Sequence, residues 1–125
     1  MTHLLDVNML LALVWASHPQ NAQASAWLGD RDVAVCPLVE LGFLRISTQP
    51  KAFNVSMSSA RTALENFLRD AKPKRLADVL PALDSHPKTS PQVTDYYLAT
   101  LAQQHGCKLA TLDGGIKHPA VVVVT

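Results

Sequence analysis

Short apolar runs alternate along the chain with longer stretches in which apolar residues recur at helical spacing. The short runs at residues 3–5, 33–35, 108–112 and 120–124 predict buried strands, and a weaker run at residues 76–80 predicts one more. Strands that alternate with helices are typical of βαβ units. The pattern therefore predicts an α/β fold in which a mainly parallel central sheet of about five strands is flanked by helices.

Proline, glycine and capping residues mark the ends of the predicted helices. The first helix covers residues 7–16 and is apolar almost all round, which predicts that it is buried. The remaining helix ends are expected as follows: the second helix ends near Gly29, the third begins with Pro37, the fourth begins at Ser56 or Ser58, and the last has Thr94 as its N-cap. Residues 84–92 hold two prolines and small polar side chains, and we expect a loop there.

Composition is consistent with one folded domain over residues 1–125. Hydrophobic residues make up 48% of the chain and charged residues 17%, which favours a globular protein with a substantial core. No targeting segment is evident, and the apolar run from Met9 to Ala16 is too short to span a bilayer. Cys36 and Cys107 form no C-x-x-C pair, so we expect free thiols in a reducing compartment, the cytoplasm.

Four of the ten acidic residues stand in or beside apolar segments. Asp6 and Asp113 follow the predicted strands at residues 3–5 and 108–112, Asp95 lies in the first turn of a predicted helix, and Glu40 lies in a helix that is apolar on nearly every side. Carboxylates in apolar surroundings are costly unless a cation or hydrogen bonds compensate. Because ligands of open α/β sheets bind outside the carboxyl ends of the strands, the four acids are expected to meet at that edge around a divalent ion.

Each acid also has a simpler interpretation. Asp6 could cap the helix that follows it, Asp113 could form a turn with the two glycines after it, and Asp95 could gain from the helix dipole. The dipole explains Glu40 poorly, because a solvated helix face would carry more polar residues than this one does. For Asn8, two positions after Asp6, we weigh a role in orienting a carboxylate or a water against a local side-chain-to-backbone bond, which is the more favoured reading.

Four stretches resemble the PIN-domain ribonucleases, in particular the VapC-type toxins of bacterial toxin–antitoxin pairs. These stretches are Leu-Asp-Val-Asn-Met-Leu-Leu-Ala-Leu at residues 5–13, Pro-Leu-Val-Glu-Leu-Gly-Phe-Leu-Arg-Ile at 37–46, Thr-Asp-Tyr-Tyr-Leu-Ala at 94–99 and Leu-Ala-Thr-Leu-Asp-Gly-Gly at 109–115. Their order and spacing span nearly the whole chain, whereas residues 51–92 match only in helical character. Gly114 and Ile116 depart from the family pattern, where many relatives carry a basic and an aromatic residue.

The resemblance implies a PIN-like three-layer fold and a Mg²⁺- or Mn²⁺-dependent endoribonuclease. It implies that Asp6, Glu40, Asp95 and Asp113 form the acidic quartet and that Thr111 supports the site. We expect Asp6, Asp95 and Asp113 to hold the metal, and Glu40 to bind it or to orient a water on it. The resemblance also implies a small antitoxin protein that inhibits the site, and a homodimer.

The balance of basic and acidic residues suggests which side chains contact RNA. If metal neutralises the four acids, the 11 lysines and arginines face only six acids, and such a chain attracts an anionic polymer. Arg45, about one helical turn from Glu40, and Lys117, four residues after Asp113, are the expected phosphate contacts. Both could instead be ordinary surface cations.

Two other classes of function remain as alternatives. The first is a non-catalytic module that keeps the same fold for binding a partner, although such a module has no need of Glu40 in an apolar helix. The second is a phosphotransfer domain of the haloacid-dehalogenase or receiver type. The former requires an Asp-x-Asp motif where this chain has Asp6-Val7-Asn8, and the latter requires paired acids at the first strand.

Overall fold

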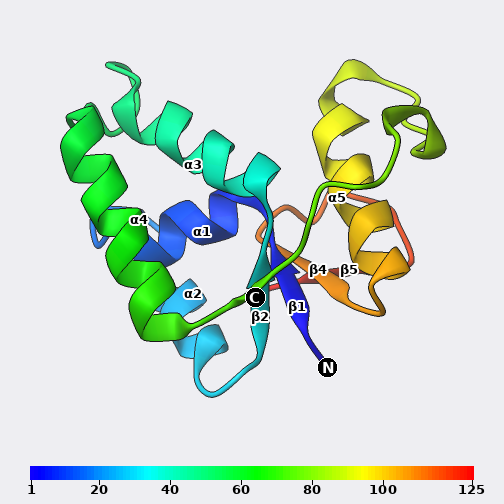
Figure 1. The fold of residues 1–125 in the computed structure, drawn as a ribbon, viewed down its shortest axis with the longest axis horizontal. Coiled ribbons are helices and arrows are strands. Elements are labelled where there is room, and N and C mark those ends of the chain that lie inside the picture. The colour runs from blue at the N-terminus through cyan, green and yellow to red at the C-terminus, as the bar shows by residue number, and fades with distance from the viewer.

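The structure is a computed structural model that describes all 125 residues, and a five-stranded parallel sheet lies at its centre (Figure 1). The strands are β1 (His3–Leu5), β2 (Val33–Val35), β3 (Lys74–Arg75), β4 (Lys108–Thr111) and β5 (Val121–Val123). The helices are α1 (Val7–Val14), α2 (Asn21–Leu28), α3 (Pro37–Thr48), α4 (Met57–Ala71) and α5 (Val93–Gln104). The α/β fold and parallel sheet predicted from the apolar runs are confirmed.

The strand order β3-β2-β1-β4-β5 puts the first strand in the middle of the sheet. The chain adds β2 and β3 on one side of β1 and then returns to add β4 and β5 on the other. In the register of β1 and β4, Leu4 lies opposite Leu109 and Leu5 opposite Ala110. The order therefore reverses between β1 and β4, and a crevice opens outside the carboxyl ends of strands at such a point.

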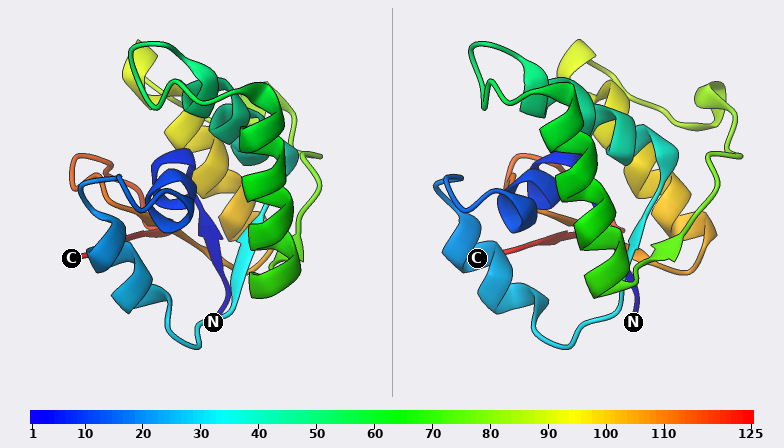
Figure 2. Two further views of the ribbon diagram at one scale, coloured as in Figure 1. Left: turned by 90° about the vertical axis from the view of Figure 1, so that its left-hand side faces the viewer. Right: turned by 60° about the vertical axis from the view of Figure 1, so that its left-hand side comes forward.

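Helices cover both faces of the sheet. Helices α1 and α5 both contact β1 and β4, and Figure 1 shows them on opposite sides of these strands. Helix α1 also packs against α2 and α3, and α3 packs against α4, so these four helices form one thick layer (Figure 2). The core between the layers includes the fully buried side chains of Leu5, Leu10, Phe43 and Leu109. None of the helices combines the length and the apolar character that a membrane-spanning segment needs.

A glycine allows α1 and α3 to come close together. Gly42 lies in α3 with its Cα turned toward Val7, the first residue of α1, and a Cβ at position 42 would lie 2.6 Å from Val7 Cγ2. A real Cβ cannot stand at that distance from a β-branched side chain without a shift of one helix. Trp15, which ends α1, adds a second tie, since its Nε1 donates a hydrogen bond to Ser47 Oγ on α3 at 2.9 Å.

The prediction of a strand at residues 76–80 is wrong. The third strand consists of Lys74 and Arg75, which pair with Ala34 and Val35 at the edge of the sheet. After the Leu76 amide donates to the Val35 carbonyl, the chain leaves the sheet. The apolar content of residues 76–80 serves packing instead, because the buried Leu80 lies beside α5 and its carbonyl accepts a hydrogen bond from the Tyr97 hydroxyl.

Several helix ends also differ from the prediction. Thr94 is not the N-cap of α5, because a 3₁₀ turn, η2 (Ser90–Gln92), runs directly into the helix and its cap is Gln92. A second 3₁₀ turn, η1 (Ala82–Asp84), ends on the first residue of the loop predicted at 84–92, and η2 occupies its last three residues. Helix α1 ends at Val14, two residues early, while Gly29 ends α2 as expected. Of the two serines considered for the start of α4, Ser56 is the N-cap, and its Oγ accepts from the Ser59 amide.

Candidate active site

Asp6 lies at the reversal point of the sheet. It follows β1 directly, and its backbone N–H donates to the Ala110 carbonyl of β4 at 3.2 Å. Its side chain caps α1, because Oδ1 accepts a hydrogen bond of 2.7 Å from the Met9 amide. The carboxylate is almost fully buried, with 5% of the residue exposed. The simple capping interpretation of Asp6 is thus correct, but it uses one carboxylate oxygen and leaves the buried charge to be explained.

The electrostatics of Asp6 disfavour its ionised form. Burial, with smaller contributions from the negative charges of Asp95 and Asp113, raises the pKa of this carboxyl group to about 6. The Thr111 hydroxyl and the Met9 amide act in the opposite direction, because both stabilise the carboxylate. A carboxylate in this position gains from any cation that enters beside it.

Asp113 and Thr111 come from the end of β4. The fully buried Thr111 accepts a hydrogen bond of 3.0 Å from the Asp113 amide through its Oγ1, so one hydroxyl serves both the turn and Asp6. Asp113 Oδ1 accepts from the Gly115 amide at 2.8 Å, which is the turn that the two glycines predicted. The Asp113 side chain is exposed to solvent at the mouth of the crevice.

Asp95 approaches from the opposite layer. It lies in the first turn of α5 and is half-buried. Burial raises the pKa of its carboxyl group, and the charge of Asp113 raises it further. The same neighbour thus raises the pKa of both Asp6 and Asp95, as expected for three carboxylates that face one space.

One cavity of about 500 Å³ unites these three acids. Polar side chains on its wall are those of Asp6, Asn8, Arg45, Thr94, Asp95 and Asp113, and apolar side chains of α1, α3, α5 and the loop after α3 complete it. No three acidic, histidine or cysteine side chains lie close enough together to hold one ion by direct contact alone. Mg²⁺ suits such spacing, since it keeps several waters and binds only one or two carboxylates directly.

Glu40 does not line this cavity. Its two carboxylate oxygens accept hydrogen bonds of 3.0 and 2.9 Å from Arg75 Nη2 on the edge strand β3. The Glu40 side chain is 14% exposed and that of Arg75 is 59% exposed. The expectation that all four acids meet around one ion therefore fails for Glu40 in this structure, because α3 turns this residue toward β3 instead of toward Asp6.

His18 is a residue of the site that sequence reasoning missed. Its Nδ1 accepts a hydrogen bond from the Gln20 amide at 3.0 Å, so the proton of the neutral ring must be on Nε2. That Nε2 lies 2.9 Å from Asn8 Oδ1 and donates to it. Burial lowers the pKa of His18, which keeps the ring neutral, and the ring stacks on Phe53 of the cavity wall.

The bond to His18 fixes the orientation of Asn8. Because its carbonyl oxygen is occupied, its NH₂ group is the part left free beside the acidic cavity. The local backbone bond favoured for Asn8 from the sequence is absent. The sequence around His18 and Pro19 gives no signal of this contact, because only the loop after α1 brings His18 close to Asn8.

The two expected phosphate contacts fall in different places. Arg45 lies on the wall of the acidic cavity and is exposed to solvent. Lys117 is exposed and does not line the cavity, and its Nζ lies 3.5 Å from the Gly114 carbonyl. Of the two predicted phosphate contacts, Arg45 therefore lies at the acidic cavity and Lys117 lies outside it.

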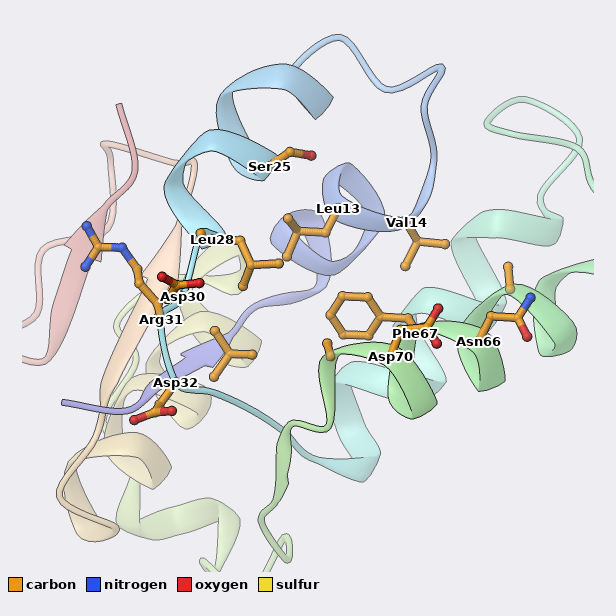
Figure 3. Close-up of a pocket in the computed structure, with 14 residues that line it drawn as sticks. Leu13, Val14, Ser25, Leu28, Asp30, Arg31, Asp32, Asn66, Phe67 and Asp70 are labelled. Carbon is orange, nitrogen blue, oxygen red and sulfur yellow. The ribbon is translucent and has the colours of Figure 1, made fainter.

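A larger cavity, about 750 Å³, lies elsewhere, between α1, α2 and α4 (Figure 3). Figure 3 shows Leu13, Leu28 and Phe67 along its floor, with Asp30 and Asp32 on the loop before β2 and Asp70 across the gap on α4. These acids are dispersed around the rim, and Asp70 pairs with Arg69. The cavity has volume but no converging polar groups, so it is the poorer candidate for chemistry.

Comparison with known proteins identifies the family of this chain. The pattern of the PIN domain family matches residues 3–122. Ribonuclease VapC38 of Mycobacterium tuberculosis (strain ATCC 25618 / H37Rv) is 37% identical over 121 residues, which cover 90% of this chain and 86% of that protein. Ribonuclease VapC29 of Mycobacterium tuberculosis (strain CDC 1551 / Oshkosh) is 38% identical over 125 residues, which cover 94% of this chain and 90% of that protein.

Two solved structures share the fold. VapBC2 from Rickettsia felis, bound to a DNA fragment from its promoter, superposes with a TM-score of 0.63 at 14% identity and covers 98% of this chain and 97% of its own. FitAcB from Neisseria gonorrhoeae superposes with a TM-score of 0.52 at 19% identity and covers 92% and 89%. With a family match over almost its whole length and relatives above 30% identity, the chain belongs to the PIN domain family, and the VapC ribonucleases are its relatives.

Proposed function

We propose that this protein is a metal-dependent endoribonuclease and the toxin of a toxin–antitoxin pair. The relatives that match nearly the whole chain carry the name ribonuclease VapC. The observation that carries the proposal for this chain is the cavity at the sheet reversal, which Asp6, Asp95 and Asp113 all line although burial and neighbouring carboxylates disfavour the ionised forms of Asp6 and Asp95. Such an arrangement is costly for a scaffold and useful for a metal site.

The donor set fits a hard divalent ion. Asp6, Asp95 and Asp113 present oxygen ligands, with no cysteine or histidine among the residues that line the cavity, and this favours Mg²⁺ or Mn²⁺ over zinc. In this proposal the three aspartates hold the ion directly or through waters. The bound ion would lower the pKa of an attacking water and neutralise charge that develops on the scissile phosphate.

The remaining residues position the aspartates and the RNA. Thr111 accepts a hydrogen bond from the Asp113 amide, and its hydroxyl also stabilises the Asp6 carboxylate, so in this proposal it supports both acids. The Asn8 NH₂ group, oriented by His18, can donate to a phosphate or carboxylate oxygen. Arg45, which lines the same cavity, attracts the RNA backbone. Glu40 contributes from outside the cavity, by tying α3, and with it Arg45, to β3 through Arg75.

The proposal includes the surroundings expected from the family. A small antitoxin would cover the acidic cavity and place a basic group against the three aspartates, which attract one at close range. Exposed apolar side chains such as Leu41, Val79, Leu83 and Val93 offer a surface on which a second copy of the chain could pack to form a homodimer. RNA as substrate and the free thiols of Cys36 and Cys107 suit a cytoplasmic protein.

The proposal is tested by incubating the purified chain, free of bound inhibitor, with total bacterial RNA. We expect discrete fragments with Mg²⁺ or Mn²⁺, none with excess EDTA, and recovery of cleavage when Mg²⁺ is restored. Cleavage that persists in EDTA would overturn the metal-dependent mechanism. Absence of cleavage with either ion, by a protein that is folded by circular dichroism, would favour the non-catalytic interaction module.

A further inference from the structure

A further cavity, which we name the second cavity, lies next to the acidic one at the first turn of α5. It has a volume of about 400 Å³ and is enclosed by the start of α3, the start of α5 and the segment that joins β3 to α5. Figure 1 shows this segment passing the start of α3 on its way to α5. Its apolar walls are those of Leu38, Leu80 and Val93, and its polar side chains are those of Asp78, Ser85 and Thr94.

The two cavities are neighbours. Thr94 lines both of them, and the next residue, Asp95, belongs to the acidic one. A chain bound with one phosphate at the three aspartates therefore has this second cavity within reach of an adjacent nucleotide. The volume is at the small end of the range for ligand pockets, which suits one base better than a helix of a partner protein.

Ser85 carries a buried hydroxyl group without a hydrogen-bond partner at the second cavity. Its residue is 6% exposed, and its Oγ is buried with no hydrogen-bond partner in the protein. An unpaired buried hydroxyl is destabilising, so its presence on a cavity wall points to a ligand that supplies the missing partner. An aliphatic side chain from another protein would fill the volume but leave Ser85 unpaired.

Asp78 places a hydrogen-bond acceptor on the wall of the cavity, which favours ligands that carry donors. Its Oδ2 accepts a hydrogen bond of 2.9 Å from the Leu38 amide, which caps α3, and a carboxylate has further acceptor positions. An acceptor-only group selects ligands with N–H donors. Two further lining residues are linked to each other, because the Tyr97 hydroxyl donates to the Leu80 carbonyl at 2.9 Å.

We propose that this cavity binds one unstacked base of the RNA, next to the phosphodiester that is cut, and that it prefers a base with an exocyclic amino group. The apolar walls cover the faces of the base, Ser85 pairs with its edge, and Asp78 accepts from the amino group, as carboxylates do from cytosine N4. The proposal rests on the proposed function, since it adds a base-specificity subsite to the same RNA site.

The test uses nucleoside 5′-monophosphates, which contain no phosphodiester to cleave, so that binding is measured whether or not the protein is a nuclease. CMP and UMP are titrated into ¹⁵N-labelled protein with EDTA present. We expect amide shifts around Ser85 and Thr94, and binding of CMP about fivefold or more tighter than UMP. Ser85→Ala should weaken CMP binding by about two- to tenfold.

Asp78→Asn is the sharpest variant. The amide oxygen can still cap α3 through the Leu38 amide, while the new NH₂ group donates instead of accepting. The preference should therefore reverse in favour of UMP. Ala82→Trp should block the cavity that Ala82 lines, and Leu83→Trp is the matched control, because Leu83 lies in the same 3₁₀ turn, is 89% exposed and does not line the cavity.

Three results would overturn the inference: no shifts with either nucleotide, an unchanged preference in Asp78→Asn, or an Ala82→Trp variant that alters self-association and leaves nucleotide binding intact. The last result would assign the cavity to the contact between two copies of the chain. Cleavage of RNA without nucleotide binding would reject the base subsite alone. Nucleotide binding without cleavage would reject the nuclease and leave a site for bases.

Discussion

Glu40 and Arg75 form a two-oxygen ion pair between α3 and the edge strand β3, with Arg75 Nη2 at 3.0 and 2.9 Å from the Glu40 oxygens. The pair explains a carboxylate in an otherwise apolar helix without requiring a metal. It also separates Glu40 from the three aspartates, which share a cavity that Glu40 does not line. In this structure Glu40 thus links α3 to β3, and three of the four predicted acids line the cavity.

If Glu40 acts through this pair, Glu40→Gln and Arg75→Ala should reduce RNA cleavage by similar factors. Each should also lower the free energy of unfolding by about 1–2 kcal/mol, since the pair is only partly exposed. Urea denaturation and initial cleavage rates measure the two effects. Arg69→Ala is the control, because it breaks the largely exposed Arg69–Asp70 pair and should cost under about 0.5 kcal/mol. A far greater loss of cleavage in Glu40→Gln than in Arg75→Ala would place Glu40 in the chemistry.

The raised pKa of Asp6 makes the metal-free protein sensitive to pH. The folded-state value of about 6 exceeds the ordinary value of 3.8, so the folded protein retains a proton that the unfolded chain has lost. The contribution of Asp6 to stability should therefore be fully present below about pH 4 and should be lost as the pH rises through 6, by up to about 3 kcal/mol for a shift of two pKa units.

Asp6→Asn should remove that dependence. In EDTA at pH 7 this variant should be more stable than the wild type, because an amide at position 6 still accepts from the Met9 amide and carries no buried charge. The same variant should lose RNA cleavage with Mg²⁺ present. Thermal unfolding between pH 4 and 7 measures the first effect, and a variant that is destabilised at pH 7 would contradict the assignment of the raised pKa.

Gly42→Ala should destabilise the protein although alanine favours helices. The new Cβ would meet Val7 Cγ2 at 2.6 Å, and the shift needed should cost about 1–3 kcal/mol, more than the gain of about 1 kcal/mol in helix propensity. Val7 follows Asp6, so the shift should also disturb the acidic cavity. Combining Gly42→Ala with Val7→Ala should recover part of the loss. If the two substitutions are additive in urea denaturation, the contact does not limit the approach of α1 to α3.

His18→Phe tests whether Asn8 needs to be oriented. Phenylalanine can keep the stacking on Phe53 but cannot donate to Asn8 Oδ1. Loss of one such bond is worth about 0.5–1.5 kcal/mol, so cleavage should fall by about two- to tenfold while the protein stays folded. If Asn8→Ala combined with His18→Phe lowers the rate no further than Asn8→Ala alone, His18 acts through Asn8. A multiplicative loss would show that the two residues act independently.

The parts of the fold that the sequence predicts are those set by local pattern. The apolar runs predict four of the five strands, Ser56 caps α4 and Gly29 ends α2, because burial periodicity and end-capping depend on neighbours along the chain. The location of Asp6, Asp95 and Asp113 near one sheet edge also follows from the parallel topology. Strand β3 could not be predicted, because two charged residues at an edge have no apolar period.

The contacts that decide roles in the site depend on three-dimensional proximity. Glu40 and Arg75 are 35 residues apart, and the apolar helix around Glu40 gave no sign of the cation that would meet it. His18 reaches Asn8 only because of the path of the loop after α1. The second cavity needs Ser85, Asp78 and Thr94 from separate segments, none of which forms a motif. Sequence patterns thus predict which carboxylates are unusual, and the structure determines which of them face one another.

The central claim, that three aspartates make a metal site that cleaves RNA, is tested most directly by one comparison of cleavage rates. Wild-type protein, Asp95→Asn and Asp70→Asn are incubated with the same labelled RNA over a range of Mg²⁺ concentrations. Asp70 is the matched control, an exposed acid on α4 remote from the acidic cavity. We expect the wild type and Asp70→Asn to cleave alike and Asp95→Asn to lose cleavage at every Mg²⁺ concentration. Cleavage by Asp95→Asn at the wild-type rate would contradict the claim.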